Sequence, residues 1–435
     1  MGKARKTIGI MACGFLYSSM FLLPYIKYIF YDAVAAASGF NNTQIGFTLS
    51  IYIVASIIAT IPSGYIADRC DPKKMMVLSG IGHAILSFLY LLFIENYVVT
   101  LIIYFGLGIT SVLMFWSPCF KAVSLAGKAE DQGKLYGWFE SFNGVGSMIM
   151  NFGALWAFGL VVGDDVGALK AVVIFYAVCS VISTLLVVFL YKSDESAVAA
   201  DKLAQQQPKE KASAKEIFAV LKMPKVWLFS LMVFGIYGFY VGSSYLTPYF
   251  TAVLGVSVTF SGALATLKNY GTRFVGAPVA GIICDKIGRL KFIAVGFVVM
   301  IILMIAFMLM PANPGVLVPI MILMFALALV NVSMKGVQFS VIDELGVDQK
   351  VNGMAISIAS LVGFNLPDVA LHPICGALLD AFEAVTAYKI IFYILLGMLV
   401  MGFVMALILI GSVKKEKART AAEKARTPHR TKRGG

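Results

Sequence analysis

Long apolar segments alternate with short polar segments along almost the whole chain. Each segment holds about 20 or more residues, the length at which an α-helix crosses the hydrocarbon core of a bilayer. Strands of a membrane barrel are about 10 residues long and alternate polar with apolar positions, which these segments do not. The pattern predicts twelve membrane-spanning helices, at residues 8–32, 43–67, 75–95, 99–125, 134–158, 168–191, 226–252, 258–283, 291–311, 314–341, 351–380 and 386–413.

A polar, charged segment divides these helices into two groups of six. The first apolar run has no A-x-A-like cleavage site before the next run, so we interpret it as a retained helix and not as a signal peptide. We therefore expect an N-terminal six-helix bundle at 1–191, a cytoplasmic linker at 192–225, a C-terminal six-helix bundle at 226–413 and a basic cytoplasmic tail at 414–435.

The composition strengthens the membrane assignment and excludes several classes of function. Hydrophobic residues make up 60% of the chain and charged residues only 13%, whereas soluble domains carry about 25% charged residues. The 6 cysteines are scattered and only 3 histidines are present, so the spacing predicts neither a metal site nor a redox cofactor. No catalytic constellation and no filter-like repeat is visible, which argues against an enzyme and against a channel.

The net charge of +12 does not indicate a nucleic-acid partner, because the cations are unevenly distributed. If the N-terminus is cytoplasmic, most of the 35 Lys and Arg residues fall in cytoplasmic loops and tails, which is the positive-inside pattern. We expect a multi-pass protein of the inner (plasma) membrane with both termini in the cytoplasm. The basic tail would contact anionic lipid, and we expect a monomer.

Two short charged fragments recur in the two halves. Residues 64–74 read GYIADRCDPKK and residues 281–291 read GIICDKIGRLK. Asp-Gln pairs at 131–132 and 348–349 are separated by the same number of positions as the glycines of the two fragments. This offset indicates a duplicated six-helix unit, and such internal repeats are typical of transporters that hold substrate at the repeat interface.

Each fragment is expected to form a cytoplasmic turn between the second and third helices of its half. It could anchor the topology, or it could be a breakable latch between helices, in which glycines allow close approach and cations suit helix C-termini and the anionic leaflet. The recurrence favours a gating latch, with Gly64, Asp68, Arg69, Gly281, Asp285 and Arg289 as its members.

The same fragments resemble the loop signature G-x-x-x-D-R-x-G-R-[RK] of the major facilitator superfamily. The second copy keeps Gly281, Asp285, Lys286, Gly288 and Arg289. The first keeps Gly64, Asp68, Arg69 and Lys73 but has Asp71-Pro72 in place of Gly-Arg. The resemblance implies the major facilitator fold, an all-α integral membrane architecture of two pseudo-symmetric bundles.

The first half also resembles the organophosphate:phosphate antiporter branch, which tends to read D-R-x-x-P in this loop and has an element like the PCFK run at 118–121. That branch holds phosphate with an arginine in helix 1 and another in helix 7. Lys27 matches the first if a two-residue gap is allowed, and Tyr240 stands at the second. An intramembrane arginine in helix 4 and a G-P-x-x-G-G run, both typical of proton-coupled drug exporters, are absent.

Charged residues inside the predicted helices are the candidate functional groups, because each costs roughly 2.5–3.5 kcal/mol at the bilayer centre. Lys268 and Arg273 lie deep in the eighth helix, and Asp368 lies at a similar depth in the eleventh. We expect Lys268 to pair with Asp368, which leaves Arg273 for the ligand. Lys27 either snorkels to the outer surface or contacts an anion there. His372, one turn beyond Asp368, is a candidate proton relay.

Other charges lie nearer the cytoplasmic ends of their helices. Glu140 could form a structural pair with Lys121, or it could take part in coupling, and Lys335 lies in the tenth helix. Cations outnumber anions among these residues, and an unpaired positive surplus predicts a mobile negative partner. The expected substrate contacts are Arg273, Lys268, Lys27, Trp116, Tyr240 and Lys335, and the expected coupling residues are Asp368 and Glu140.

We therefore interpret the chain as a secondary active transporter that moves a small organic or inorganic anion by alternating access, with a proton or a counter-anion as the coupled ion. The alternative is a proton-coupled carrier of a neutral polar solute such as a sugar or nucleoside, in which Asp368 or Glu140 titrates.

Overall fold

The chain is almost entirely helical. A computed structural model describes residues 3–127, 132–194, 197–199, 220–345 and 349–426. The first half contains α1 Lys3–Met20, α2 Lys27–Ser38, α3 Asn42–Arg69, α4 Pro72–Leu92, α5 Tyr97–Gly108, α6 Ser117–Ser124, α7 Gln132–Gly159 and α8 Asp165–Leu190.

The second half contains α11 Pro224–Gly242, α12 Leu246–Ala252, α13 Val258–Thr266, α14 Thr272–Ile287, α15 Arg289–Met308, α16 Leu317–Val337, α17 Gln349–Ser360, α18 Leu366–Ala381 and α19 Ala384–Arg426. Short 3₁₀ segments lie at η3 Ser243–Tyr245, η5 Pro314–Val316 and η6 Gln338–Leu345. Wide π-helical turns join three pairs of helices, at η1 Ile109–Trp116, η4 Leu267–Gly271 and η7 Leu361–Asn365.

Nine helices within the described residues are long and apolar enough to span a membrane. The three other predicted spans are the first, fifth and eighth. The first is broken between Met20 and Lys27, where turns replace the helix. The other two carry charges and amides in their middle portions, namely Glu140 and Asn143 in α7 and Lys268 and Arg273 in η4 and α14. These polar residues lower the mean hydropathy of the two segments, and Glu140, Asn143 and Arg273 line a cavity between the halves.

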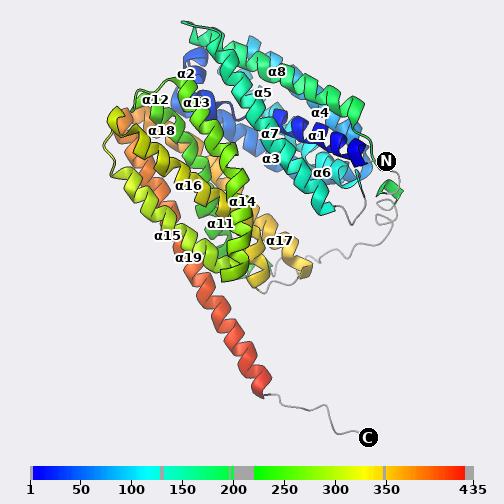
Figure 1. The fold of residues 1–435 in the computed structure, drawn as a ribbon, viewed down its shortest axis with the longest axis vertical. Helices are drawn as coiled ribbons and strands as arrows, with labels where there is room; N and C mark the ends of the chain where they lie inside the picture. The colour runs from blue at the N-terminus through cyan, green and yellow to red at the C-terminus, as the bar shows by residue number, and fades with distance from the viewer. Residues whose placement is uncertain (1–2, 128–131, 195–196, 200–219, 346–348, 427–435) are drawn as a thin grey trace.

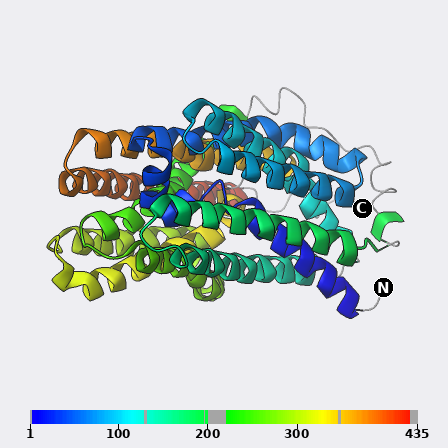
Figure 2. The same cartoon turned by 90° about the horizontal axis from the view of Figure 1, so that it is seen from above.

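The two groups of helices meet at one end and separate toward the other (Figure 1). They converge around α2, α12, α13 and α18, where α18 packs against α3 and α13 packs against α2 and α7. Toward α6 and α17 the groups diverge, and the start of α1 and the end of α19 lie at this same end (Figure 2). We call these the closed end and the open end. Within the expected orientation, the closed end faces outward.

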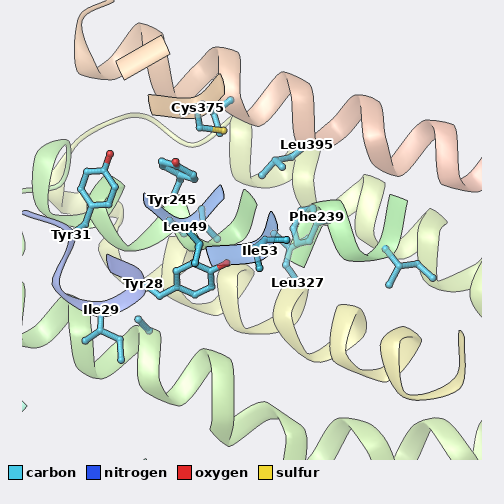
Figure 3. Close-up of a cluster of buried hydrophobic side chains, with 14 of the residues drawn as sticks. Tyr28, Ile29, Tyr31, Leu49, Ile53, Phe239, Tyr245, Leu327, Cys375 and Leu395 are labelled. Carbon is cyan, nitrogen blue, oxygen red and sulfur yellow. The ribbon is translucent and has the colours of Figure 1, made fainter. Parts of the chain in front are cut away.

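An apolar core continues across both groups at the closed end. Tyr28 and Leu49 of the first half lie in the same buried cluster as Phe239, Tyr245 and Cys375 of the second (Figure 3). Burial of aromatic side chains supplies most of the attraction in such a cluster.

A carboxylate also joins the two halves at the closed end. Asp380, near the end of α18, accepts hydrogen bonds from the backbone N–H and side-chain Nδ2 of Asn42, at 2.9 and 2.8 Å. It also accepts from the backbone N–H and the hydroxyl of Thr43, at 2.8 and 2.6 Å. The first N–H groups of a helix have no partner within the helix and attract anions. Asp380 therefore binds the N-terminus of α3 from the opposite half.

Glycines permit this close approach of α3 and α18. A Cβ atom added to Gly376 would meet the backbone of Asn42, and one added to Gly46 would meet the backbone of His372. Near the same end, the Thr251 hydroxyl donates to Asp32 at 2.5 Å and links α12 to α2. The closed end is thus held by backbone packing and by hydrogen bonds between the halves.

The two recurring fragments build their turns differently. In the first, the Asp71 side chain caps the N-terminus of α4, with Pro72 at the first helical position, a position that suits proline. Lys73 donates to the carbonyls of Val188 and Tyr191 at the end of α8, at 2.7 and 3.0 Å. This arrangement explains the Asp-Pro departure from the loop signature.

In the second fragment, Gly288 has a φ of +88°, which favours glycine, and no side chain of its own caps α15. Glu344 supplies the cap by accepting from the backbone N–H of Arg289 at 2.9 Å. The duplicated loops have therefore acquired separate capping chemistry.

The predicted linker and tail are only partly described. Residues 195–196 and 200–219 of the linker and 427–435 of the tail lie outside the described residues. The last helix is longer than expected, because α19 continues to Arg426 instead of ending at 413.

Candidate functional site

A cavity of about 380 Å³ lies between the two halves. The first half lines it from α1, the turn at 21–26, α2, η1 and α7, and the second half lines it from α11, η4, α14 and α16. The volume falls within the ~300–1,000 Å³ range of pockets that hold small organic ligands. Its lining is mostly aromatic and amide side chains, with two basic residues and one acidic residue.

Arg273 is the central cation of this lining. It lies one residue into α14, directly after the wide turn η4. Its guanidinium donates to the Tyr240 hydroxyl at 3.3 Å and lies 5.7 Å from the centre of the Tyr270 ring. Within the described residues no carboxylate lies within ion-pair distance of Arg273, so most of its five donors are available to a ligand.

Lys335, on α16, is the second cation. Its Nζ lies 3.2 Å from the centre of the Tyr240 ring and 4.8 Å from that of Tyr237. Aromatic faces attract cations through the ring quadrupole, but they leave the charge uncompensated. Among the residues that the structure describes, Lys335 also has no acidic side chain within ion-pair distance. Within the described residues, two cations from one half therefore face the cavity with no carboxylate at ion-pair distance.

Glu140 is the acidic residue of the lining and comes from α7 in the opposite half. Its Oε2 accepts from Asn143 at 3.4 Å, and it interacts electrostatically with Arg273 across the cavity. The expected structural pair with Lys121 is wrong, because Lys121 pairs with Asp68 at 3.5 Å. Glu140 lines the cavity instead, and Lys121 contacts Asp68 at the end of α3.

An aromatic wall lines the first-half side of the cavity. Trp116 ends the wide turn η1 and is 39% exposed. Its ring centre lies 5.7 Å from that of Tyr17 and 6.1 Å from that of Phe21, and the Phe21 ring lies 6.5 Å from that of Tyr25. These four rings, which are tilted by 43° to 88° in the three pairs, form one connected aromatic cluster, which we call the aromatic wall.

A second cavity, of about 670 Å³, shares Glu140, Asn143, Tyr270, Arg273 and Lys335 with the first. It also touches Gly137 of α7 and Gly336 of α16, both nearer the open end. The charged part of the site is thus continuous with a vestibule at the open end of the molecule. In the expected orientation this is an inward-open state.

Two of the predicted substrate contacts lie outside the lining of the main cavity. Lys268 is buried and its Nζ donates to the carbonyl and hydroxyl of Ser243, at 2.8 and 3.2 Å. The expected Lys268–Asp368 pair is therefore wrong. The cause is the wide turn η4, which changes the angular spacing that an ordinary helix would give.

Lys27 is also buried, at 4% exposure, which excludes snorkelling to the surface. The helix is interrupted by turns just before Lys27. The depth of Lys27 obtained by counting residues along an unbroken helix is therefore wrong. Its Nζ lies 5.6 Å from the centre of the Tyr245 ring and has no hydrogen-bond partner within the described residues. Lys27 therefore lies behind the cavity, at the interface between the halves.

Asp368 lies close to this interface. Its Oδ2 accepts from the Tyr237 hydroxyl at 3.1 Å, and its Oδ1 lies 3.7 Å from Nε2 of His372. The same His372 nitrogen lies 3.3 Å from the Tyr28 hydroxyl of the first half. Lys335 and Lys27 interact electrostatically with Asp368. The predicted carboxylate–histidine neighbourhood is present, and it connects both halves.

The predicted latch residues contact their own halves in this conformation. Asp68 pairs with Lys121, and Arg69 lies 4.0 Å from the centre of its own helix's Tyr65 ring. Arg289 donates to the Ser340 carbonyl at 2.8 Å. Space around Gly64 is open, so the close approach expected there does not occur in this state. The surroundings of Gly281 and the side chain of Asp285 lie outside the part of the chain that the structure describes.

Several lining residues were missed by the sequence analysis, chiefly Tyr17, Asn151, Asn269 and Tyr270. Asn269 and Tyr270 follow directly after Lys268. Their position next to a charged residue deep in a predicted helix was the signal in the sequence that could have identified them. Tyr17 and Asn151 look like ordinary core residues in a sequence. Within the described residues, no group of three or more His, Cys, Asp or Glu side chains could hold a metal.

Comparisons with known proteins bear on this geometry. Residues 7–366 match the sequence pattern of the Major Facilitator Superfamily. The chain is 30% identical to the inner membrane protein YqcE of Escherichia coli (strain K12), over 92% of this chain and 93% of that protein. It is 25% identical to the inner membrane protein YihN of the same organism, over 95% and 96%.

Solved structures share the fold at lower identity. A bacterial homologue of the human lysosomal transporter Spinster, inward-facing and occupied, superposes with a TM-score of 0.72 at 16% identity, over 95% of this chain and 98% of that one. The nucleoside transporter NupG gives 0.71 at 12% identity, over 94% and 99%. These likenesses extend over nearly the whole chain, and at such identities they concern the fold alone.

Proposed function

The chain belongs to the major facilitator superfamily and is a secondary transporter that works by alternating access, and we propose that its substrate is a small anion. As both E. coli relatives are named inner membrane proteins, we assign it to the inner membrane. Neither E. coli relative is named as an organophosphate:phosphate antiporter, so the resemblance of the first half to that branch does not narrow the substrate.

One observation carries the anion proposal. Arg273 and Lys335 face the cavity without a carboxylate within ion-pair distance, among the residues described. Taking a charge out of water is costly unless it is paired. An anion in the cavity would supply the missing partner, and the guanidinium suits the two oxygens of a carboxylate, sulfonate or phosphate.

Alternating access follows from the asymmetry between the two ends. The ligand would enter through the vestibule at the open end and bind Arg273 and Lys335. Movement of the first half toward the second would then bring Glu140 and the aromatic wall against the bound ligand. Rupture of the Asp380 and Thr251 hydrogen bonds at the closed end would open the opposite face.

The charge surplus also bears on coupling. Without an anion, closure would bring two cations into a drier cavity and would be disfavoured. Exchange or co-transport is therefore favoured over leak. Asp368 is our candidate proton carrier, because it is buried beside His372 at the junction of the halves, and Glu140 is the second candidate.

Ligand binding to purified protein tests the anion proposal. A ligand that binds the folded state raises the melting temperature, so the panel comprises inorganic phosphate, acetate, gluconate, glucuronate, glucose 6-phosphate and neutral glucose. We expect anions to raise the melting temperature, and the Arg273→Gln variant to lose at least tenfold in affinity. Lys389→Gln, which removes an exposed charge from α19, is the matched control.

The alternative remains a proton-coupled carrier of a neutral polar solute, favoured by the buried Asp368–His372 pair. In that case glucose or another neutral compound would raise the melting temperature, and Arg273→Gln would leave its binding largely intact. A shift by neutral compounds alone would reject the anion proposal.

A further inference from the structure

The cavity has two chemically different sides. The cations Arg273 and Lys335 come from α14 and α16 in the second half, whereas the aromatic wall comes from α1, the turn at 21–26 and η1 in the first half. A ligand that touches both sides must therefore carry a charged group and a separate body that packs on aromatic faces.

The cavity has room for a ligand larger than an inorganic anion. Its volume of about 380 Å³ is comparable to the pockets that enclose organic ligands. A single tetrahedral oxyanion bound at Arg273 would fill only part of this volume. The wall includes an indole that is 39% exposed, and an exposed aromatic face in a ligand cavity is a surface that a flat apolar face can cover.

Polar groups between the two sides are also available. Asn269 faces the cavity from η4, and the hydroxyls of Tyr17 and Tyr25 lie in the wall itself. Within the described part of the chain these three side-chain groups have no hydrogen-bond partner. Amides and phenols without partners bind ligand hydroxyls, because each can donate and accept.

From this arrangement we infer that the substrate is a ring-bearing organic anion, with its charged group at Arg273 and Lys335 and a hydroxylated ring packed on Trp116 and Phe21. This inference rests on the proposed function, because it assumes that the two cations hold an anionic group. The C–H face of the ring covers the wall, and its hydroxyls bond to the amide and the phenols.

Matched probes separate the ring from the charge. Glucuronate and gluconate are both monocarboxylates with several hydroxyls, but only glucuronate forms a ring. Glucose has the ring without the charge, and inorganic phosphate has the charge without any organic group. Glycine betaine has a cationic head that an aromatic face and Glu140 could also attract. Each probe is titrated against the purified full-length protein while its melting temperature is followed.

We expect glucuronate and glucose 6-phosphate to bind at least fivefold more tightly than gluconate and phosphate, and more tightly than glucose or glycine betaine. Trp116→Ala should weaken the ring anions about fivefold and change phosphate by less than twofold, in line with the strength of ring stacking. Trp116→Phe should retain most of the affinity, which tests the contact even if the alanine variant folds poorly. Trp138→Ala, at an exposed indole on α7 outside the cavity lining, is the matched control.

The outcomes separate the two proposals. If gluconate or phosphate binds as tightly as the ring anions, or if Trp116→Ala affects all anions equally, the ring inference is overturned and the anion transporter stands. Preference for glycine betaine overturns it in favour of a zwitterion. If no anion of the panel binds, the proposed function fails and the ring inference fails with it.

Discussion

Replacement of Asp380 by alanine should open the end of the molecule that is closed in this structure. Asp380 accepts four hydrogen bonds from Asn42 and Thr43 across the junction of the halves. In the opposite state of the transporter α3 and α18 must separate at this end, so these bonds exist only while the end is closed. Their loss would shift the equilibrium between the two states without affecting the core of either half.

The size of the shift follows from the exposure of the carboxylate. Four hydrogen bonds to a buried charge would be worth far more, but Asp380 is exposed, and water and salt weaken its interactions. Side-chain caps at helix N-termini contribute about 0.5–2 kcal/mol, and Asp380 acts as a second cap on α3 in addition to Asn41. We expect a loss of about 1.4 kcal/mol, which is roughly tenfold in the equilibrium constant.

The native Cys375 reports this equilibrium. It is fully buried on α18, five residues before Asp380, and Figure 3 shows it in the cluster at the closed end. A membrane-impermeant maleimide applied to the outer face of cells should modify it only when α3 and α18 separate. Mass spectrometry of the Cys375 peptide gives the rate, which we expect to rise about tenfold in Asp380→Ala and by less in Asp380→Asn, since an amide retains one acceptor oxygen.

Two controls exclude trivial explanations. Glu383→Gln removes a neighbouring exposed carboxylate and should leave the rate unchanged. Cys13 and Cys119 are fully buried within the first half, and they should stay protected unless the variant unfolds. An unchanged rate at Cys375 in Asp380→Ala, with Cys13 protected, would refute the assignment of these hydrogen bonds to the gate.

Three other substitutions test separate features of the structure. Gly376→Ala places a Cβ against the backbone at the start of α3, so the maleimide reaction should accelerate at least as much as in Asp380→Ala. Glu140→Gln removes the carboxylate that competes with the ligand for Arg273. The affinity for anions, measured from the rise in melting temperature on titration, should increase two- to fivefold. A lower affinity for anions would mean that Glu140 contacts the ligand directly. Lys268→Met removes the donor to the buried Ser243 carbonyl, which should destabilise the ligand-free protein by about 1–3 kcal/mol, seen as a lower melting temperature; unchanged stability would contradict the structural role of Lys268.

The sequence predicted the architecture because lipid imposes it. Backbone groups in a bilayer must be satisfied within helices, so twelve apolar runs and a duplicated loop were enough for the fold class. Arg273 was identified by its depth and charge, and Lys335 by its charge within a predicted helix, and both line the cavity. The bounds of the linker and of the two bundles stay a prediction, since much of the linker lies outside the described residues.

The sequence could not predict toward which neighbour each side chain points around its helix axis. Helical periodicity assumes a constant rotation per residue, and the wide turns η1, η4 and η7 break it just before Ser117, Thr272 and Leu366. Each of these turns adjoins residues of the site, in keeping with the occurrence of π-bulges at functional sites. The Asp380 contact was equally hidden, because it joins residues that lie far apart in the chain and that have no unusual local pattern.

The division of the cavity between the two halves connects the ring inference to the transport cycle. A ligand shifts a conformational equilibrium only by the difference between its affinities for the two states. An anion held by Arg273 and Lys335 alone touches one half, and it gains little when the other half approaches. A ligand whose body also reaches the aromatic wall gains contacts as the open end closes, and that gain can offset the Asp380 hydrogen bonds that must break at the other end. If this is correct, phosphate should accelerate the reaction of Cys375 only slightly, through charge neutralisation, whereas a ring-bearing anion should accelerate it several-fold more. An equal effect of both ligands would show that charge neutralisation alone drives the movement.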